Sequence, residues 1–412
     1  MGTIDQVLLS ALKVKHAHLR ASSLLRHLLV VDEVHASDTY MTTVLREVLS
    51  RHRASGGHAL LMSATLGGST RAALLGKSKA PSLEEALATP YPLLTHQVES
   101  SEAASERAIR HEGRERSVRV ELCSEMQDHS VTARRALVAA RAGARVLVLR
   151  NTVRACHATQ LELEALAGSQ EAELLFGVGS VVAPHHSRFA KNDRTALDEA
   201  IEKRFGKVRA NSSGAVAVAT QTVQQSLDLD ADLLITDLCP MDVLLQRIGR
   251  LHRHERASRP PGFEAPKVIV LVPAERDLAA YLRPKREVRG PRGSGFGLVY
   301  EDLRVLQATW EQLIVRGTLE IPKDARALVE RSVHPEVLRN LVAERGGLWP
   351  EHQQHVLGEE GADRSVAKQN LFRFTDSYDD LSFMRSEDGH IKTRLGEGDR
   401  PSPPRTEKHT SE

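Results

Sequence analysis

The chain has 412 residues, enough for two to three domains of about 150 residues each. A hydrophobic fraction of 41% excludes a globally disordered polypeptide, and a formal net charge of +2 excludes polyanion binding through a strong overall field. Aromatic residues make up only 4%, which argues against a surface built mainly on base stacking.

The three cysteines lie far apart without metal-ligand spacing, so each is predicted to be a small core residue (Cys123, Cys156, Cys239). No apolar run approaches the ~20 residues of a membrane-spanning helix, and the first residues show no signal-peptide pattern. We therefore expect a soluble, cytoplasmic protein without a membrane partner.

The first segment of the chain alternates helical patterns with short apolar runs. Hydrophobic spacing predicts helices at 6–12, 19–25 and 42–49, and fully buried parallel strands at 28–31 and 59–62. A charged polar stretch follows, and we place a linker there (99–117) after a first domain (1–98).

The next segment, 118–275, repeats the alternation more clearly and predicts a doubly wound α/β domain. The strands predicted here are 118–122, 145–149, 180–183, 215–219, 233–236 and 268–272. The helices predicted between them are 131–142, 155–166, 194–205 and 244–248. Ligands of such sheets bind at the carboxyl ends of the strands.

The character of the sequence changes near residue 276. An Arg/Gly/Pro-rich run at 283–295 precedes helical patterns at 301–315 and 325–342, so we predict a mainly helical accessory region (276–384). The polar, Pro/Ser/Glu-rich end, 385–412, is predicted to be disordered.

Two acidic residues, Asp32 and Glu33, follow the first predicted strand. An acid at such a strand end can hold magnesium beside the phosphates of a nucleotide, and a neighbouring acid can polarise the attacking water. Taken alone, the pair fits two solvated acids equally well. A second strand ending in Ser63-Ala64-Thr65 makes the pattern specific, because small hydroxyl residues there can bond to the neighbouring strand end.

A basic segment, Gln246-Arg247-Ile248-Gly249-Arg250-Leu251-His252-Arg253, is the third element. Arginines three apart fall on one face of a helical turn, and the glycine between them lets a partner or phosphate approach closely. Guanidinium groups that reach a γ-phosphate from another domain raise turnover by about a thousandfold or more. An isolated basic helix is most simply a surface helix. This one follows the segment ATQTVQQSLDLD, and that context favours phosphate-contacting arginines instead.

In this order, DEVH, SAT, ATQTVQQSLDLD and QRIGRLHR resemble motifs II, III, V and VI of superfamily 2 helicases. Together with GTIDQ at 2–6, DEVHASDTYM and PHHSRF, they resemble the helicase core of the type I CRISPR-associated helicase–nuclease over about residues 2–255. The resemblance implies tandem RecA-like lobes, the first incomplete, followed by a mainly helical C-terminal accessory region. A DEAH-type RNA helicase is less favoured, because GTIDQ and HHSRF fit it poorly.

The resemblance also implies roles for particular residues, with ATP and magnesium as cofactors. Asp32 and Glu33 would serve magnesium and water, and hydrolysis would be linked to movement by His35, Ser63 and Thr65. Gln246, Arg250 and Arg253 would reach ATP across the cleft between the lobes, near Asp228. Single-stranded DNA would be contacted, largely through phosphates, by Gly2, Thr3, Asn151, Thr152, Thr220 and Gln221. Gln224 stands where the family has Glu.

Two parts of the family pattern are absent from this sequence. The phosphate-binding loop G-x-x-x-x-G-K-[ST] does not occur, since Gly76-Lys77-Ser78 has Arg71 where the first glycine belongs. The nuclease would need a His-Asp pair, which is also absent, and His185-His186 and His352/His355 are predicted to be surface residues rather than metal ligands.

Our hypothesis is that the chain is the downstream piece of a longer helicase, whose upstream fragment carries the phosphate loop and nuclease. The incomplete first lobe should then expose a sheet edge and apolar faces, and the isolated chain should have little or no ATPase activity. The alternative is an inactive remnant that binds single-stranded DNA or the CRISPR surveillance complex.

Overall fold

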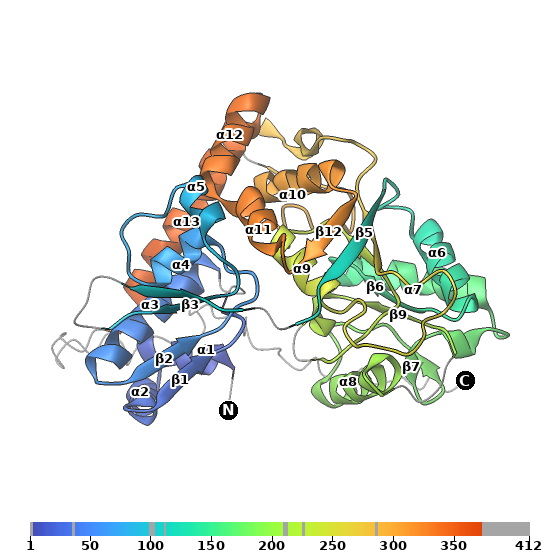
Figure 1. Cartoon of the computed structure of the whole chain (residues 1–412), viewed down its shortest axis with the longest axis horizontal. Coiled ribbons are helices and arrows are strands. Elements are labelled where there is room, and N and C mark those ends of the chain that lie inside the picture. The colour runs from blue at the N-terminus through green and yellow to red at the C-terminus, as the bar shows by residue number, and fades with distance from the viewer. Residues whose placement is uncertain are drawn as a thin grey trace, which may run out of the picture. The chain divides into compact units, whose positions relative to one another are not determined.

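Figure 1 shows the computed structural model of the chain, which describes residues 3–34, 38–98, 104–110, 113–208, 213–224, 227–284 and 287–372. The chain divides into two compact units: Met1–Ser63 with Glu359–Glu412, hereafter unit 1, and Ala64–Gly358, hereafter unit 2. No helix in the described ranges is both long and apolar enough to cross a bilayer.

The described residues of the first part of unit 1 form three helices and a pair of strands, and the elements predicted there are confirmed to within about five residues. In order they are α1 (Ile4–Leu8), the 3-10 turn η1 (Leu9–Ala11), α2 (Ala17–Leu24), β1 (Leu28–Val31), α3 (Thr39–Ala54) and β2 (His58–Leu61). The two strands form a parallel two-stranded sheet.

Helix α3 is the main helix of this unit. Asp38 caps its first turn by accepting a hydrogen bond from the Met41 amide at 2.7 Å. One face of the helix buries Met41, Val44, Leu45 and Val48, which is the spacing of an amphipathic helix. Gly56, with φ of 78°, follows the end of the helix in the left-handed conformation that commonly terminates helices.

Residues from far along the chain complete unit 1. Helix α13 (Trp349–Asn370) ends beside the first residues of the chain, where Leu371 and Leu12 form an antiparallel bridge. The Asn370 carbonyl accepts from the Lys13 amide at 2.9 Å, and the Phe372 amide donates to the Ala11 carbonyl at 2.8 Å. Unit 1 is therefore built from two chain segments separated by the whole of unit 2.

The prediction that both strands of unit 1 are fully buried is wrong. Leu29 and Val31 are buried, but the exposed fractions on the opposite face are 61% for Leu28, 48% for Val30 and 40% for Leu60. Parallel sheets are normally covered on both faces, but no part of the chain that the structure describes covers this apolar face. Its exposure agrees with the expectation of an uncovered apolar face.

Unit 2 is organised around a six-stranded sheet with the order β12-β5-β11-β10-β6-β9. The strands are β5 (Arg116–Cys123), β6 (Arg145–Leu149), β9 (Ala215–Ala219), β10 (Leu233–Asp237), β11 (Lys267–Leu271) and β12 (Thr318–Ile321). Five run parallel, and β12 joins antiparallel beside β5. Five of the strands predicted for 118–275 are confirmed in this sheet, and so is the α/β class. The strand predicted at 180–183 is β8 (Val181–Val182), which pairs with β7 (Gly177–Val178) in a separate two-stranded sheet.

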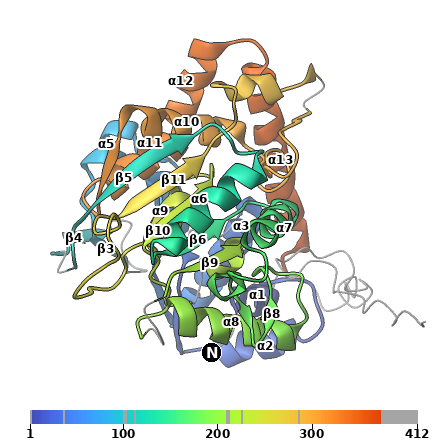
Figure 2. The same ribbon diagram turned by 90° about the vertical axis from the view of Figure 1, so that its right-hand side faces the viewer.

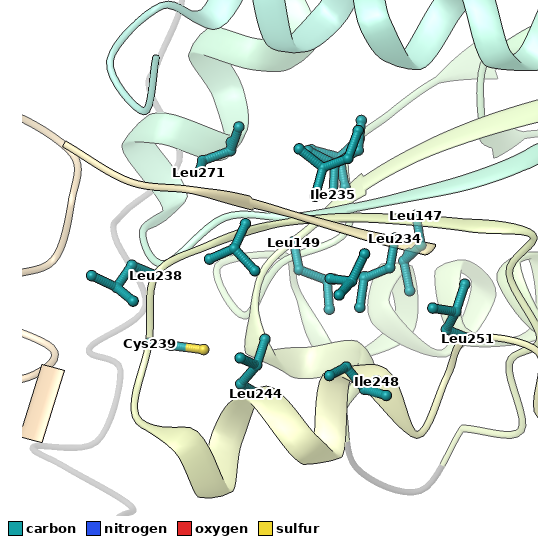
Figure 3. Packing of buried hydrophobic residues seen from close by; sticks show 14 of the residues in the cluster. Leu147, Leu149, Leu234, Ile235, Leu238, Cys239, Leu244, Ile248, Leu251 and Leu271 are labelled. Atoms are coloured by element: carbon teal, nitrogen blue, oxygen red, sulfur yellow. The ribbon is translucent and has the colours of Figure 1, made fainter. Parts of the chain in front are cut away.

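Helices cover both faces of this sheet (Figure 2). Those in the central part of the chain are α6 (His129–Arg141), α7 (Val153–Ala167), α8 (Lys191–Phe205) and α9 (Met241–Ile248). Figure 3 shows Leu149 and Leu234 directed toward Leu244 and Ile248 of α9, while Ile235 is directed to the opposite face. Strands β6, β9 and β10 are buried along their whole length because both faces are covered. They are mainly apolar, except for Arg145 at the start of β6 and Thr236 and Asp237 at the end of β10.

The region after residue 276 is mainly helical, as predicted, but it differs in two details. Strand β12 was not predicted, and it completes an edge of the central sheet. The helix predicted at 325–342 is two helices, α11 (Ala325–Val333) and α12 (Pro335–Arg345), after α10 (Leu303–Val315). Proline has no amide hydrogen and disfavours a helical residue before it, so Pro335 ends one helix and begins the next.

The stretch after Ser63 belongs to unit 2. It forms α4 (Gly68–Leu74), α5 (Leu83–Ala88) and the hairpin β3 (Leu93–His96) with β4 (Ser105–Ala108), so the predicted linker 99–117 contains strand residues. The buried Glu330 of α11 accepts from the Gly68 amide at 2.7 Å. The domain limits predicted from the sequence stay predictions. The tail predicted to be disordered, 385–412, lies outside the described residues.

A candidate nucleotide site and a candidate strand-binding cavity

The acidic pair of unit 1 follows β1 directly. Asp32 and Glu33 are both exposed, and Glu33 has a left-handed φ of 53°, an uncommon conformation for a residue other than glycine. Its amide donates to Asp32 Oδ1 at 2.9 Å. The turn is held to the neighbouring strand end by the Val34 amide, which donates to the Met62 carbonyl at 3.1 Å. Both carboxylates are therefore presented to solvent at the carboxyl end of the strand.

This arrangement suits a magnesium ion that binds through few protein ligands. Among the described residues, no group of three or more His, Cys, Asp or Glu side chains has the arrangement of a metal site. Magnesium commonly uses one or two carboxylates and completes its shell with water and substrate phosphates. Asp32 and Glu33 fit that requirement.

The other residues predicted for this half of the site are distributed as follows. Ser63 follows β2 and is half-buried at the same sheet end as Asp32, because Val31 pairs with Leu61. Thr65 is buried and belongs to unit 2. Thr3 is exposed at the start of α1, whereas Gly2 and His35 lie outside the described residues.

Four of the residues predicted to contact nucleic acid meet at one cavity of unit 2. Asn151 and Thr152 follow β6, and Thr220 and Gln221 follow the adjacent β9. All four line a cavity of about 610 Å³, together with Arg154, His157, Arg188 and residues of the segment 291–299. The described lining residues include no carboxylate. The cavity therefore offers a basic, acid-free surface at the carboxyl ends of two parallel strands.

The start of helix α7 adds to this surface. Thr152 caps the helix by accepting from the Ala155 amide at 3.1 Å, and the exposed Arg154 lies in the first turn. Amides in a first helical turn have no acceptor within the helix, and the helix dipole favours negative charge there. A phosphate group is the ligand that such a position takes most readily.

Asn151 and Thr152 nevertheless use their side chains within the protein. The Asn151 amide group donates to the carbonyls of Leu238 at 2.8 Å and Ser294 at 2.9 Å, and Asn151 is buried. The Thr152 hydroxyl donates to the Gly293 carbonyl at 2.8 Å. Both side chains thus hold the glycine-rich segment near residue 294 against the sheet.

A buried ion pair that was not predicted from the sequence adjoins the cavity residue Asn151. Arg150 Nε donates to Asp237 Oδ2 at 3.1 Å, and the same oxygen accepts from the Asn151 amide at 2.8 Å. Arg150 also donates to Thr159 Oγ1 at 3.0 Å and to the Met126 carbonyl at 2.8 Å. The pair fixes the ends of β6 and β10 relative to each other. Charged residues at the ends of two otherwise apolar strands were the available sequence signal.

The burial of Arg247 was also not predicted from the sequence. It is fully buried, and it donates to Thr236 Oγ1 at 2.6 Å, Asn151 Oδ1 at 3.1 Å and Tyr300 Oη at 3.1 Å. The Gln224 side-chain oxygen, in the amide orientation that satisfies its neighbours, accepts from Arg247 Nε at 2.6 Å. Arg247 thereby connects the cavity residue Asn151 with the segment that contains Gln224.

The prediction that Arg247 and Arg250 share one helical face is wrong. Helix α9 ends at Ile248, Arg247 points into the core, and Arg250 is partly exposed beyond the helix end. Arg250 donates to the Gln224 carbonyl at 2.5 Å. A side chain at Gly249 would place its Cβ only 2.9 Å from the Gln246 carbonyl oxygen, so local backbone packing explains this glycine.

The remaining residues predicted to contact ATP are Gln246, Arg253 and Asp228. Like Arg250, Arg253 contacts the chain segment that follows β9. Gln246 is half-buried on α9, and the exposed pair Arg253 and Asp228 is joined by a contact of 2.9 Å between Nε and Oδ1. Asp228 also contacts His254 Nε2 at 2.9 Å. Exposed pairs of this kind are weak, so Arg253 can exchange its carboxylate for a phosphate at small cost.

The prediction that His185 and His186 are surface residues is wrong, because both are buried. His185 bonds to Thr222 Oγ1 at 2.8 Å and to Asp198 Oδ1 at 2.7 Å, which joins the segment after β9 to α8. His186 Nε2 lies 2.8 Å from His157 Nε2. Burial lowers the pKa of both residues, that of His186 to about 4, so His186 is neutral at pH 7.

His352 was likewise predicted to be at the surface and is buried. Its Nε2 accepts from the Leu303 amide at 3.0 Å, at the start of α10. Burial lowers its pKa to about 4. The expectation for the cysteines is confirmed: all three are free thiols in the core (Cys123, Cys156, Cys239).

Comparisons with known proteins agree with the sequence motifs. A family model described as "CRISPR-associated nuclease/helicase Cas3, C-terminal" matches residues 142–256. The chain is 35% identical over 318 residues to the CRISPR-associated endonuclease/helicase Cas3 of Escherichia coli, covering 76% of this chain and 33% of that protein. For the Cas3 of Thermus thermophilus, identity is 34% over 359 residues, covering 80% and 37%. The chain therefore spans about a third of the length of these relatives.

Solved structures show the same relationship. The structure of T. fusca Cas3 with AMPPNP matches with a TM-score of 0.70 and 29% identity, covering 90% of this chain and 42% of that one. A chain of a "CRISPR RNA-guided surveillance complex, pre-nicking" matches with a TM-score of 0.68 and 28% identity, covering 90% and 44%.

Proposed function

The chain belongs to the Cas3 family of CRISPR-associated nuclease/helicases, and from this premise we propose that it forms part of an ATP-dependent helicase core that moves on single-stranded DNA. In this proposal residues 118–275 are the second RecA-like lobe, and 1–98 belong to the first. The observation that carries the proposal is the basic cavity of unit 2, which unites Asn151, Thr152, Thr220 and Gln221 at adjoining strand ends.

The chemistry of that cavity supports a nucleic-acid backbone as the ligand. Arg154 and Arg188 are exposed and line the cavity, and no described lining residue would repel a phosphate. Contacts of this kind are to phosphate and carry no sequence information. We therefore propose binding that is independent of base sequence and weakens as salt concentration rises.

For ATP, we propose that unit 2 supplies cationic and polar groups and that unit 1 supplies the acids. Arg250 and Arg253 would contact phosphate oxygens together with Gln246, near Asp228, and Ser63 and Thr65 would link hydrolysis to movement. Asp32 and Glu33 would hold magnesium, which neutralises phosphate charge when it is bound. Arg250 and Arg253 each have one main partner to release, the Gln224 carbonyl and Asp228 respectively.

We further propose that hydrolysis needs a partner segment that carries a phosphate-binding loop. The 412 residues contain no G-x-x-x-x-G-K-[ST] pattern, and the backbone amides and lysine of such a loop are the main cradle for β- and γ-phosphates. The exposed apolar face formed by Leu28, Val30 and Leu60 gives such a segment a surface to cover. The surveillance complex is proposed as a second partner, on the basis of the matching structure.

A second candidate function is an inactive module that binds single-stranded DNA. One observation favours it: the cavity and the core beneath it lie entirely within unit 2, so strand binding does not depend on the acids of unit 1. The two candidates differ in whether a partner segment restores hydrolysis.

The deciding experiment measures ATP hydrolysis with single-stranded DNA, by this chain alone and mixed with the polypeptide encoded directly upstream. Arg250→Ala is the test variant, and Arg289→Ala, at an exposed surface pair, is the matched control. Activity only in the mixture, lost in Arg250→Ala and kept in Arg289→Ala, supports the helicase proposal. No hydrolysis in any mixture, with DNA binding retained, favours the binding module.

A further inference from the structure

We propose that the glycine-rich segment 290–300, hereafter the glycine loop, forms a wall of the strand-binding cavity, and that Leu298 contacts a base of the bound strand. In this proposal Asn151 positions the loop, in place of the direct strand contact that the sequence motif implies. The inference rests on the proposed function and deepens it, because it names a base-contacting residue at the same cavity.

The loop is fixed to the rest of unit 2 at three places along its length. The Gly293 carbonyl accepts from Thr152 Oγ1 at 2.8 Å, and the Ser294 carbonyl accepts from Asn151 Nδ2 at 2.9 Å. At the far end, Tyr300 Oη accepts from the buried Arg247 at 3.1 Å. The loop is thus a constructed part of the cavity, held by two of the residues that the motifs single out.

Its glycines are needed for the path it takes. Gly293 and Gly295 have φ of 82° and 81°, a region that other residues rarely adopt. A Cβ at Gly295 would lie 3.1 Å from the Val299 Cβ and 3.3 Å from the Asn151 Cβ, so a side chain there would crowd both neighbours in a backbone conformation that is already unfavourable for it. The Val299 amide donates back to the Gly295 carbonyl at 2.7 Å and closes a tight turn.

That turn presents apolar side chains to the cavity. Leu298 is 79% exposed and Val299 is 39% exposed, and both line the cavity together with Arg154 and Arg188. Phe296, by contrast, is buried and anchors the loop. A nucleic-acid strand has two chemically different sides: charged phosphates, which the arginines suit, and apolar base faces, which Leu298 suits. The cavity offers both kinds of surface.

The test compares two fluorescent probes, an oligo-dT strand and a strand of equal length with abasic sites in place of the bases. Binding to the full chain is measured by fluorescence anisotropy at fixed low salt. Leu298→Ser should weaken oligo-dT binding about fivefold, the effect of uncovering roughly half a leucine side chain, and leave abasic binding unchanged. Val315→Ser is the matched control, since Val315 is 84% exposed and is absent from the cavity lining.

Asn151→Ala tests the positioning role. It should reduce the preference for oligo-dT over the abasic strand by the same factor, a ratio that a general loss of stability would not change. If Leu298→Ser binds oligo-dT as tightly as the unaltered chain while Arg188→Ala weakens both probes, the loop inference is overturned and the proposed function stands. If the unaltered chain binds neither probe, both are overturned.

Discussion

Replacement of Arg247 by alanine tests whether this arginine holds unit 2 together or contacts the nucleotide. Arg247 is fully buried and donates to Thr236, Asn151 and Tyr300. The hydroxyl groups of Thr236 and Tyr300 can rotate toward other acceptors after the change. The side-chain oxygens of Asn151 and Gln224 cannot become donors, and they lose the group that satisfies them.

The expected cost follows from those two oxygens and the space left behind. A buried acceptor without a donor costs about 1–3 kcal/mol, and the void of a deleted side chain adds to this. We therefore expect Arg247→Ala to lower the free energy of unfolding of unit 2 by about 3–5 kcal/mol, the combined cost of two such oxygens and the void. Arg250→Ala, which loses one hydrogen bond at a partly exposed site, should cost about 1 kcal/mol or less.

Urea unfolding followed by tryptophan fluorescence measures this difference directly. The sequence contains two tryptophans, Trp310 and Trp349, and both are buried in unit 2. With a dependence of about 3 kcal/mol per molar urea, the midpoint of Arg247→Ala should fall by roughly 1–1.7 M. A midpoint equal to that of the unaltered chain would refute the assignment of Arg247 as a buried structural residue.

Three further outcomes are expected. The double change Leu28→Ser and Val30→Ser should alter the free energy of unfolding by no more than about 0.5 kcal/mol, because both side chains are exposed. It should also reduce self-association, measured by size-exclusion chromatography. A large loss of stability would show that the two side chains are buried in solution. Burial holds the pKa of His352 at about 4, below the ~6.5 of an unfolded chain, so its stabilising effect is complete above pH 6.5 and is lost as the pH falls toward 4. Between pH 6.5 and 5.5 this loss is about 1 kcal/mol, and His352→Gln, which keeps an acceptor for the Leu303 amide, should unfold with a measurably flatter pH dependence. Gln224→Glu should raise the urea midpoint of unit 2 at pH 7, since a carboxylate bonds Arg247 more strongly than an amide oxygen does; an unchanged or lower midpoint would contradict the contact.

The sheet of unit 2 was predictable because its signals are local. Strands such as 145–149 and 215–219 are short apolar runs bounded by polar residues, and their helices show clear amphipathic spacing. Asn151, Thr152, Thr220 and Gln221 were named through the resemblance to helicase motifs, and the structure places them after the adjacent strands β6 and β9. Their contact with a nucleic-acid strand stays a prediction.

Features that depend on distant contacts were not predictable. Strand β12 has only four residues, and its place at the sheet edge depends on β5, about 200 residues earlier. The burial of His185 depends on Asp198 and Thr222, which no local pattern joins to it. For β1 and β2, the apolar runs were read as buried on the assumption of covering layers, whereas one face is exposed.

The two-segment construction of unit 1 has a consequence for synthesis on the ribosome. Its N-terminal segment ends at Ser63, but the strand-like contact that joins it to the chain's later part requires Leu371. At about 5–20 residues per second, the earlier segment waits roughly 15–60 seconds for that partner, with Leu28 and Val30 exposed throughout. We expect unit 2 to fold first and unit 1 to be completed last. Nascent chains stalled before residue 371 and the released full-length chain should therefore differ in chaperone binding and in proteolysis of the first 63 residues.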